Sequence, residues 1–235
     1  VPVFIATVIE FPGRAMFQIV SPLVAKAINE KDFVTLSSLL RKSAKNLSLV
    51  SGLLFLLINL NLDDFYEWVN LSDYTAALEV VLIVSVGKLF NMSMGCLNNI
   101  IINSKYYYYV FWFSSLSAIM AVILNLYFIQ WYGIIGAAYA TLFVMLFINL
   151  QKILLVQYSF KINPYRMESL RTIVIVVLLY FLVSSITIDY DPFKAMMFRS
   201  ILIVVAFALL AYLLRLTSDI QQFLAKIILP LTKKG

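Results

Sequence analysis

Apolar residues occur in seven long runs along this 235-residue chain, and short polar stretches separate them. Each run has about the 20 residues that an α-helix needs to cross the ~30 Å hydrocarbon layer of a bilayer. Backbone groups in hydrocarbon must hydrogen-bond within their own segment, so we expect helices. The sequence therefore predicts an all-α polytopic membrane helix bundle with about seven transmembrane helices, at residues 3–27, 44–62, 75–98, 107–129, 134–156, 170–187 and 195–214.

The first run carries a stripe of polar residues on one helix face, because their spacing is four, four and three. These residues are Glu10, Arg14, Gln18 and Ser21. Pro12-Gly13 lies between the two charges and predicts a kink. A charge at the bilayer centre costs roughly 2.5–3.5 kcal/mol, so the stripe should face protein or water. It either lines a transport path or stabilises the bundle through an internal Glu10–Arg14 ion pair.

The third run repeats this pattern. Lys88, Asn91, Gly95, Asn98 and Ile102 fall on one helix face, with Asn99 beside it. Lys88 lies about halfway through the span, too far from either interface to reach water by extending its side chain. Its counter-charge must come from another helix, from Glu10 or from a bound cargo. Hydrogen bonding between helices is the alternative role, and it suits the asparagines better than Lys88, which we expect to line a cavity.

The loops alternate in charge. The first, third and fifth loops and the tail are basic, whereas the second, fourth and sixth are acidic or neutral; the loops are residues 28–43, 63–74, 99–106, 130–133, 157–169 and 188–194. The positive-inside rule then places the basic loops and the C-terminus in the cytoplasm. Short amphipathic helices are expected within 28–43 and over 219–229, the second on the anionic inner leaflet.

Composition narrows the possible functions. The chain is 63% hydrophobic and 13% charged, with a mean hydropathy of +0.93, which is typical of an integral membrane protein. It has no histidine, which excludes His-based catalysis and metal sites, and its one cysteine, Cys96, has no disulfide partner. A formal charge of +6 would indicate nucleic-acid binding in a soluble protein, but it does not do so in a membrane protein. We expect no catalytic residue, metal, cofactor or nucleic-acid partner.

The last two runs differ from the others. Residues 170–187 carry no central charge, and Arg199 is the only charge within 195–214. Both should form peripheral, lipid-facing helices. In the fifth run, Gly133, Gly136, Ala137, Ala140 and Thr141 predict a small-residue face for close helix packing. The chain has no initiator Met and begins inside an apolar run, so we expect the C-terminal part of a longer protein.

Three stretches carry a resemblance to a known family. They are Ser21-Pro22-Leu-Val-Ala25, the loop EKDFVTLSSLLRKS and the helix start YGIIGAAYATL. Over residues 1–160 the chain resembles the C-terminal half of bacterial polysaccharide-biosynthesis membrane proteins, the oligosaccharide-lipid flippases of the multidrug/oligosaccharidyl-lipid/polysaccharide exporter superfamily. Residues 161–216 fit that family's additional C-terminal helix pair, which leaves 217–235 as an amphipathic basic cytoplasmic tail.

The resemblance implies a fold and a function. It implies two six-helix lobes that rock around a central cavity, with alternating access and no covalent chemistry. This chain would be most of the second lobe, without the N-terminal lobe. The cargo would be a lipid-linked oligosaccharide, a polysaccharide or O-antigen (lipopolysaccharide) precursor, moved across the bacterial inner membrane. Arg14 and Lys88 could hold its anionic head, and Gln18, Asn91, Asn98 and Asn99 its hydroxyls.

Two alternatives remain open. In a multidrug/cation antiporter of the same superfamily, Glu10 would carry the coupling ion, H⁺ or Na⁺. In a membrane glycosyltransferase or polymerase, Asp63-Asp64 on an outer loop could hold a divalent metal. Against an enzyme, the outer loops are short and acidic loops are expected outside by the positive-inside rule.

Overall fold

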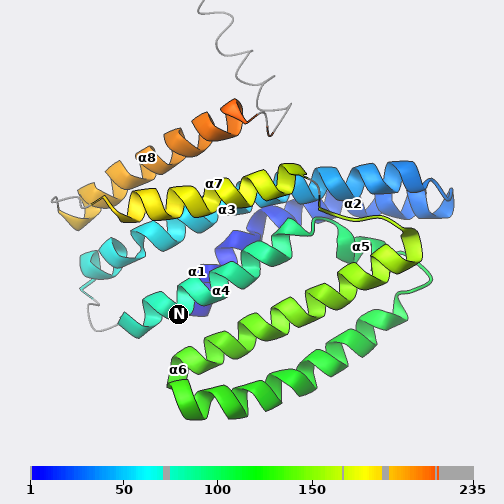
Figure 1. Ribbon diagram of the computed structural model, residues 1–235, viewed down its shortest axis with the longest axis horizontal. Coiled ribbons are helices and arrows are strands. Elements are labelled where there is room, and N and C mark those ends of the chain that lie inside the picture. The colour runs from blue at the N-terminus through cyan, green and yellow to red at the C-terminus, as the bar shows by residue number, and fades with distance from the viewer. Residues whose placement is uncertain (1, 71–74, 166, 187–190, 215, 217–235) are drawn as a thin grey trace, which may run out of the picture.

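The computed structural model describes residues 2–70, 75–165, 167–186, 191–214 and 216, and these form helices and turns without a strand. Figure 1 shows the helices side by side in a long, flattened bundle. The elements are α1 (Pro2–Thr7), the 3₁₀ turn η1 (Val8–Glu10), α2 (Phe11–Asn29), α3 (Phe33–Trp68), α4 (Thr75–Ser93), α5 (Leu97–Ile102), α6 (Tyr108–Phe160), α7 (Met167–Ser184) and α8 (Pro192–Leu213).

Five helical stretches of the described chain are long and apolar enough to cross a membrane. They are Pro2–Asn29, Phe33–Trp68, Ala76–Ser93, Tyr108–Phe160 and Pro192–Leu213. The fourth consists of two arms, and α7 contributes a shorter apolar helix. The predicted fold class is therefore confirmed: the chain is a polytopic all-α membrane bundle.

The helix α3 corrects the prediction for the first loop. Instead of a separate short helix within 28–43, one helix of 36 residues begins at Phe33. Asp32 caps it, because its carboxylate accepts bonds from the Thr35 hydroxyl and N–H, which hold the pKa of Asp32 below its ordinary value. No proline or glycine occurs between Phe33 and Gly52, and Leu36 and Leu40 extend the buried face. At about 54 Å, α3 is longer than the hydrocarbon layer is thick.

The third apolar run is broken, which corrects the expectation of one continuous face. The helix α4 ends at Ser93, the chain turns through Gly95 at φ +60°, and α5 follows. The turn packs directly on α3, since the Cys96 N–H donates to Ser43 Oγ at 2.9 Å. Asn98 therefore does not continue the helix face that carries Lys88 and Asn91.

The fourth and fifth runs form a helical hairpin within α6, which Figure 1 shows at the edge of the bundle. The chain reverses at Gly133, whose φ of 58° and ψ of −135° are strongly disfavoured for residues with a side chain. Just after the reversal, a Cβ at Gly136 would collide with the carbonyl oxygen of Phe128. Of the predicted small-residue face, Gly136 and the fully buried Ala140 are closely packed, whereas a Cβ at Gly133 would meet nothing of the described chain within 4 Å.

The three basic loops meet at one end of the bundle. The ring centroid of Phe160 lies 6.2 Å from that of Phe33 and 5.8 Å from that of Tyr106. These aromatic residues join the start of α3, the α5–α6 turn and the end of α6. The opposite end contains the Gly133 reversal and the acidic last turns of α3.

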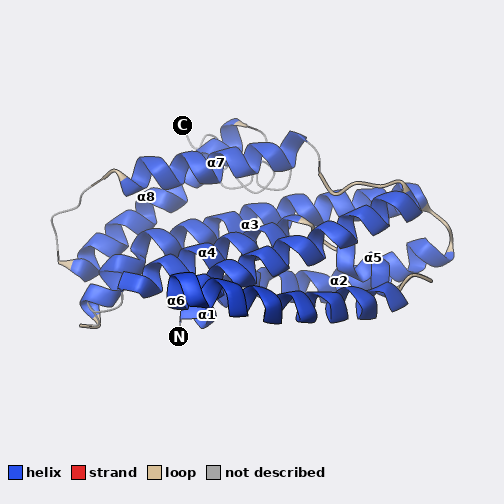
Figure 2. Cartoon of the chain, turned by 60° about the horizontal axis from the view of Figure 1, so that its bottom comes forward, coloured by secondary structure: helices blue, strands red, loops and turns tan. Residues whose placement is uncertain are grey.

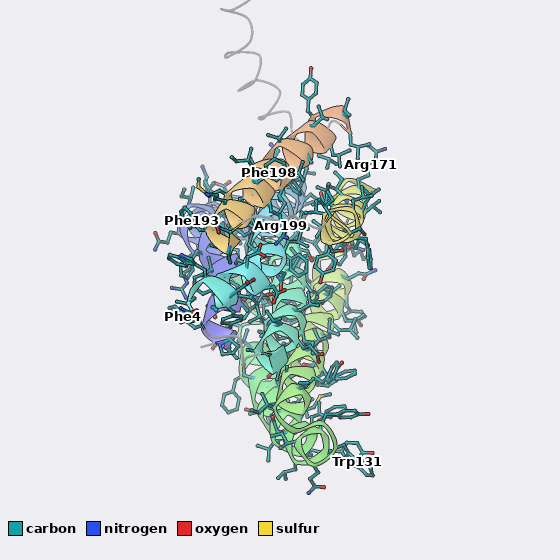
Figure 3. All side chains as sticks on the ribbon, turned by 90° about the vertical axis from the view of Figure 1, so that its left-hand side faces the viewer. Phe4, Trp131, Arg171, Phe193, Phe198 and Arg199 are labelled. Atoms are coloured by element: carbon teal, nitrogen blue, oxygen red, sulfur yellow. The ribbon has the colours of Figure 1, made fainter. Side chains whose placement is uncertain are left out.

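The helices α7 and α8 pack on α3 at the edge opposite the α6 hairpin (Figure 2). They share one hydrophobic cluster with α3, in which Leu56 and Ile203 are fully buried. Arg199 points from α8 toward α3 (Figure 3), where its guanidinium donates to the Leu60 carbonyl at 2.8 Å and to the Asp64 carboxylate. The predicted tail, 217–235, lies outside the described residues.

Candidate functional site

An ion pair crosses the middle of the bundle. Lys88 Nζ on α4 donates to Glu10 Oε2 at 2.9 Å, and Asn91 Nδ2 donates to Glu10 Oε1 at 2.9 Å. The Lys88 and Glu10 side chains are only 16% and 18% exposed. One helical turn separates Lys88 from Asn91, so α4 presents both to the same carboxylate.

This geometry contradicts the predicted ion pair between Glu10 and Arg14. Glu10 ends the 3₁₀ turn η1 and precedes the first turn of α2, so it is not in one regular α-helix with Arg14. Pro12 has no N–H to bond to the Val8 carbonyl, which favours this irregular turn and fits the predicted kink. Arg14 is exposed, and its guanidinium lies 5.2 Å from the Phe11 ring centroid.

Lys88 thus takes its counter-charge from Glu10, one of the three sources that the sequence allows. A charged group held by a carboxylate at hydrogen-bond distance has little attraction left for an anionic cargo. The pair lies between helices of this chain, where it compensates the cost of two charges within the membrane. Its position favours a structural role for Lys88 over cargo binding.

A small polar cavity of about 150 Å³ lies beside this ion pair, at the break between α4 and α5. Its lining consists of Phe17, Asn91, Met92, Met94, Gly95, Leu97, Asn98, Asn149 and Lys152. Two residues of the predicted set, Asn91 and Asn98, therefore meet in one cavity although the helix between them is broken. The turn at Gly95 creates the space, since it ends α4 and displaces α5.

The second arm of α6 contributes the two other polar groups of this cavity. Asn149 is only 2% exposed, and Lys152 is partly buried one turn further along the same helix face. Within the described part of the chain, neither side chain has a hydrogen-bond or ion-pair partner. A buried amide and an ammonium without partners are costly, unless water or a ligand occupies the cavity.

Sequence reasoning missed Asn149 and Lys152. In the sequence, Lys152 lies next to the basic fifth loop and therefore looks like an interface residue. In the structure, α6 continues for eight more residues, about 12 Å, to Phe160. The available signal was the polar cluster Asn149, Gln151 and Lys152 in an otherwise apolar run. Its i, i+3 spacing places Asn149 and Lys152 on one face.

The remaining candidates lie around the same region. Gln18 and Arg14 are on the exposed face of α2, while Phe17 beside them lines the cavity. Asn99 is partly buried on α5, and its carbonyl accepts a bond from the Asn103 side chain. Asn103 also contacts Ser21 at 3.3 Å, which ties α2 to the end of α5.

Fold and cavity define the chain as a multi-pass membrane protein with polar groups inside the bundle. No family model, no curated protein and no solved structure matches the chain.

Proposed function

We propose that the chain is the second lobe of a flippase that moves a lipid-linked oligosaccharide, a polysaccharide or O-antigen precursor, across the bacterial inner membrane by alternating access. The observation that carries the proposal is the cavity lined by Asn149 and Lys152, because among the described residues these polar groups lie unpaired in the interior of the membrane helix bundle. Ionisable groups inside membrane helices are rare, and one without a partner is a candidate for a substrate or ion path.

The chemistry of the cavity suits part of such a cargo. The Lys152 ammonium attracts a phosphate oxygen, and the amides of Asn91, Asn98 and Asn149 both donate to and accept from hydroxyl groups. At about 150 Å³ the cavity has room for a head group, while a whole oligosaccharide would extend beyond it. The exposed face of α2, with Arg14 and Gln18, offers further contacts of the same kind.

The ion pair of Glu10 argues against the antiporter. Lys88 and Asn91 occupy both oxygens of its carboxylate, so a Na⁺ or a cationic drug would have to displace an ammonium 2.9 Å away. The enzymatic alternative also loses support, because the Asp64 carboxylate contacts Arg199 instead of forming an open metal site with Asp63. We therefore keep the flippase as the single proposal.

Reconstitution of the complete gene product in liposomes tests the proposal. A fluorescent lipid-diphosphate oligosaccharide in the outer leaflet is followed by its protection from a membrane-impermeant quencher. We expect Lys152→Gln to reduce the translocation rate at least tenfold, about 1.4 kcal/mol, through loss of one charge-assisted contact. Lys105→Gln is the matched control, because Lys105 is exposed and outside the cavity.

The outcomes separate the alternatives. Equal thermal stability of both variants with loss of translocation only in Lys152→Gln supports the flippase. Unchanged translocation in Lys152→Gln overturns the role of the cavity. Uptake of an organic cation driven by a proton or sodium gradient, without lipid translocation, identifies an antiporter instead.

A further inference from the structure

A second and larger cavity opens at the basic end of the bundle. It measures about 630 Å³ and lies between the first turns of α3 and the end of α6, which Figure 1 shows at the same end of the molecule. We call it the basic groove. Its lining consists of Phe33, Val34, Ser37, Ser38, Arg41, Lys42, Lys45, Phe160, Lys161, Ile162 and Pro164.

The polar side of the basic groove is cationic. Arg41, Lys42 and Lys161 are exposed, and the hydroxyls of Ser37 and Ser38 lie one turn before the two cations of α3. None of the lining residues is acidic. The spacing on α3 places hydroxyl and cationic groups along the same strip of the helix, as a phosphate with several oxygens requires.

The other side of the basic groove is apolar and open. Val34 is 83% exposed, and the Phe33 ring, also exposed, contacts Phe160 at the rim of the groove. Exposed apolar side chains next to cationic groups are typical of a surface at a membrane interface.

The groove lies at the depth of lipid head groups. The apolar part of α3 begins after the cluster of basic residues and continues from Leu47 to Leu62. Since α3 is about 54 Å long, its first turns stand outside the ~30 Å hydrocarbon layer. The aromatic cluster of Phe33, Tyr106 and Phe160 marks the interface at the same level.

We propose that the basic groove binds the head group of an anionic diacyl glycerophospholipid, with Arg41, Lys42 and Lys161 on the phosphate and the acyl chains directed along α3 toward its apolar part. Basic pockets between membrane helices are known to select such lipids. The positive-inside distribution explains cations at this end, but it does not require them to line a concave, half-apolar groove. The inference is independent of the transport function.

Native mass spectrometry of the full-length protein in detergent measures the binding. The probes are dioleoylphosphatidylglycerol and, as the neutral comparison, dioleoylphosphatidylcholine. The test variant is Arg41→Gln/Lys42→Gln/Lys161→Gln, and the matched control is Lys26→Gln/Lys105→Gln/Arg171→Gln. The control removes equal charge from exposed positions that do not line the groove.

We expect the wild type and the control to retain the anionic lipid and the groove variant to bind it about a hundredfold more weakly, at roughly fivefold per cationic side chain. Equal weakening in both variants would overturn the groove in favour of diffuse surface charge. Unchanged binding in the groove variant would also overturn it. Binding of glycerol phosphate with the same affinity as the lipid would overturn the assignment of a membrane lipid. A melting temperature within error of the wild type confirms that each variant is folded.

Discussion

At the scale of single residues, the arrangement around Glu10 shows how a charge is tolerated inside the bundle. Its carboxylate accepts one bond from an ammonium and one from an amide, both from α4. Each of its oxygens therefore has a partner, which is the condition for burying an ionised group without a prohibitive cost. The network fixes the relative rotation of the first helix and α4 through hydrogen bonds as well as apolar contact.

The Glu10–Lys88 pair gives a first prediction. Glu10→Gln should lower the free energy of unfolding by about 2–4 kcal/mol, because Lys88 is left uncompensated in a largely buried site. The double variant Glu10→Gln/Lys88→Met should recover part of the loss, with a coupling energy of about 1–3 kcal/mol. Reversible unfolding in mixed micelles measures these free energies.

Arg14 provides the control for this cycle. Because Arg14 contacts the Phe11 ring and not Glu10, the effects of Glu10→Gln and Arg14→Gln should add within about 0.5 kcal/mol. A strong coupling of Glu10 to Arg14, or none to Lys88, would contradict the arrangement.

The two neighbouring aspartates at the end of α3 give a second prediction. Asp64 contacts Arg199 in a site where the two side chains are only 16% and 13% exposed, whereas Asp63 is exposed. Asp64→Asn should lower the free energy of unfolding by about 2–3 kcal/mol, since the Arg199 guanidinium then lacks its carboxylate. Asp63→Asn, with the same chemical change one position away, should alter it by less than about 0.5 kcal/mol. Equal effects in the same unfolding assay would show that the ion pair does not anchor α8.

At the scale of elements, glycines at positive φ decide where helices end. Gly95 and Gly133 both have φ near +60°, but their surroundings differ. A Cβ at Gly95 would collide with the backbone of Ala44 and lie 2.5 Å from Ser43 Oγ, while Gly133 has open space around it. The turn after α4 is therefore packed closely against α3, whereas a Cβ at Gly133, where α6 reverses, would contact no neighbouring element of the described chain.

This difference gives a third prediction. Gly133→Ala should destabilise the protein by about 1–2 kcal/mol, the conformational cost of a side chain at positive φ. Gly95→Ala should cost about 3–4 kcal/mol, because steric overlap with α3 adds to that cost. The same micelle unfolding assay compares the two variants, and equal losses would contradict the close packing at Gly95.

The elements also show what the sequence can and cannot reveal. Apolar length alone located the spans, because the bilayer requires a helix wherever about 20 apolar residues follow one another. The length of α3 and the break at Gly95 depend on packing between helices, which periodicity does not report. The partner of Glu10 is 78 positions away, so local spacing favoured the nearer but wrong Arg14.

The candidate cavity was only partly predictable for a related reason. Asn91 and Asn98 stood out because polar residues are rare in an apolar run, and both line the cavity. Lys152 did not stand out, because its place in the helix depends on where α6 ends. A residue near a predicted helix boundary changes from interface to interior when that boundary moves by about one turn.

At the scale of the whole molecule, charge is distributed between the two ends of the bundle. The aromatic contacts of Phe160 gather the first, third and fifth loops at one end, and the acidic turns of α3 lie at the other. The helices thus bring together loops whose basic character was predicted separately. Anionic lipids and the membrane potential both favour the basic end on the cytoplasmic side.

This polarity gives the last prediction, which uses single cysteines at Asn70 and Lys105 in a Cys96→Ala background. Both positions are exposed, Asn70 just after α3 and Lys105 in the turn before α6, at opposite ends of the bundle. A membrane-impermeant maleimide should label position 70 in intact cells and position 105 only after permeabilisation, because the positive-inside rule keeps the basic turn in the cytoplasm. Labelling in permeabilised cells shows that both thiols can react. The reverse labelling pattern would show that the bundle has the opposite orientation in the membrane. The basic groove would then face the outer leaflet instead of the anionic inner leaflet.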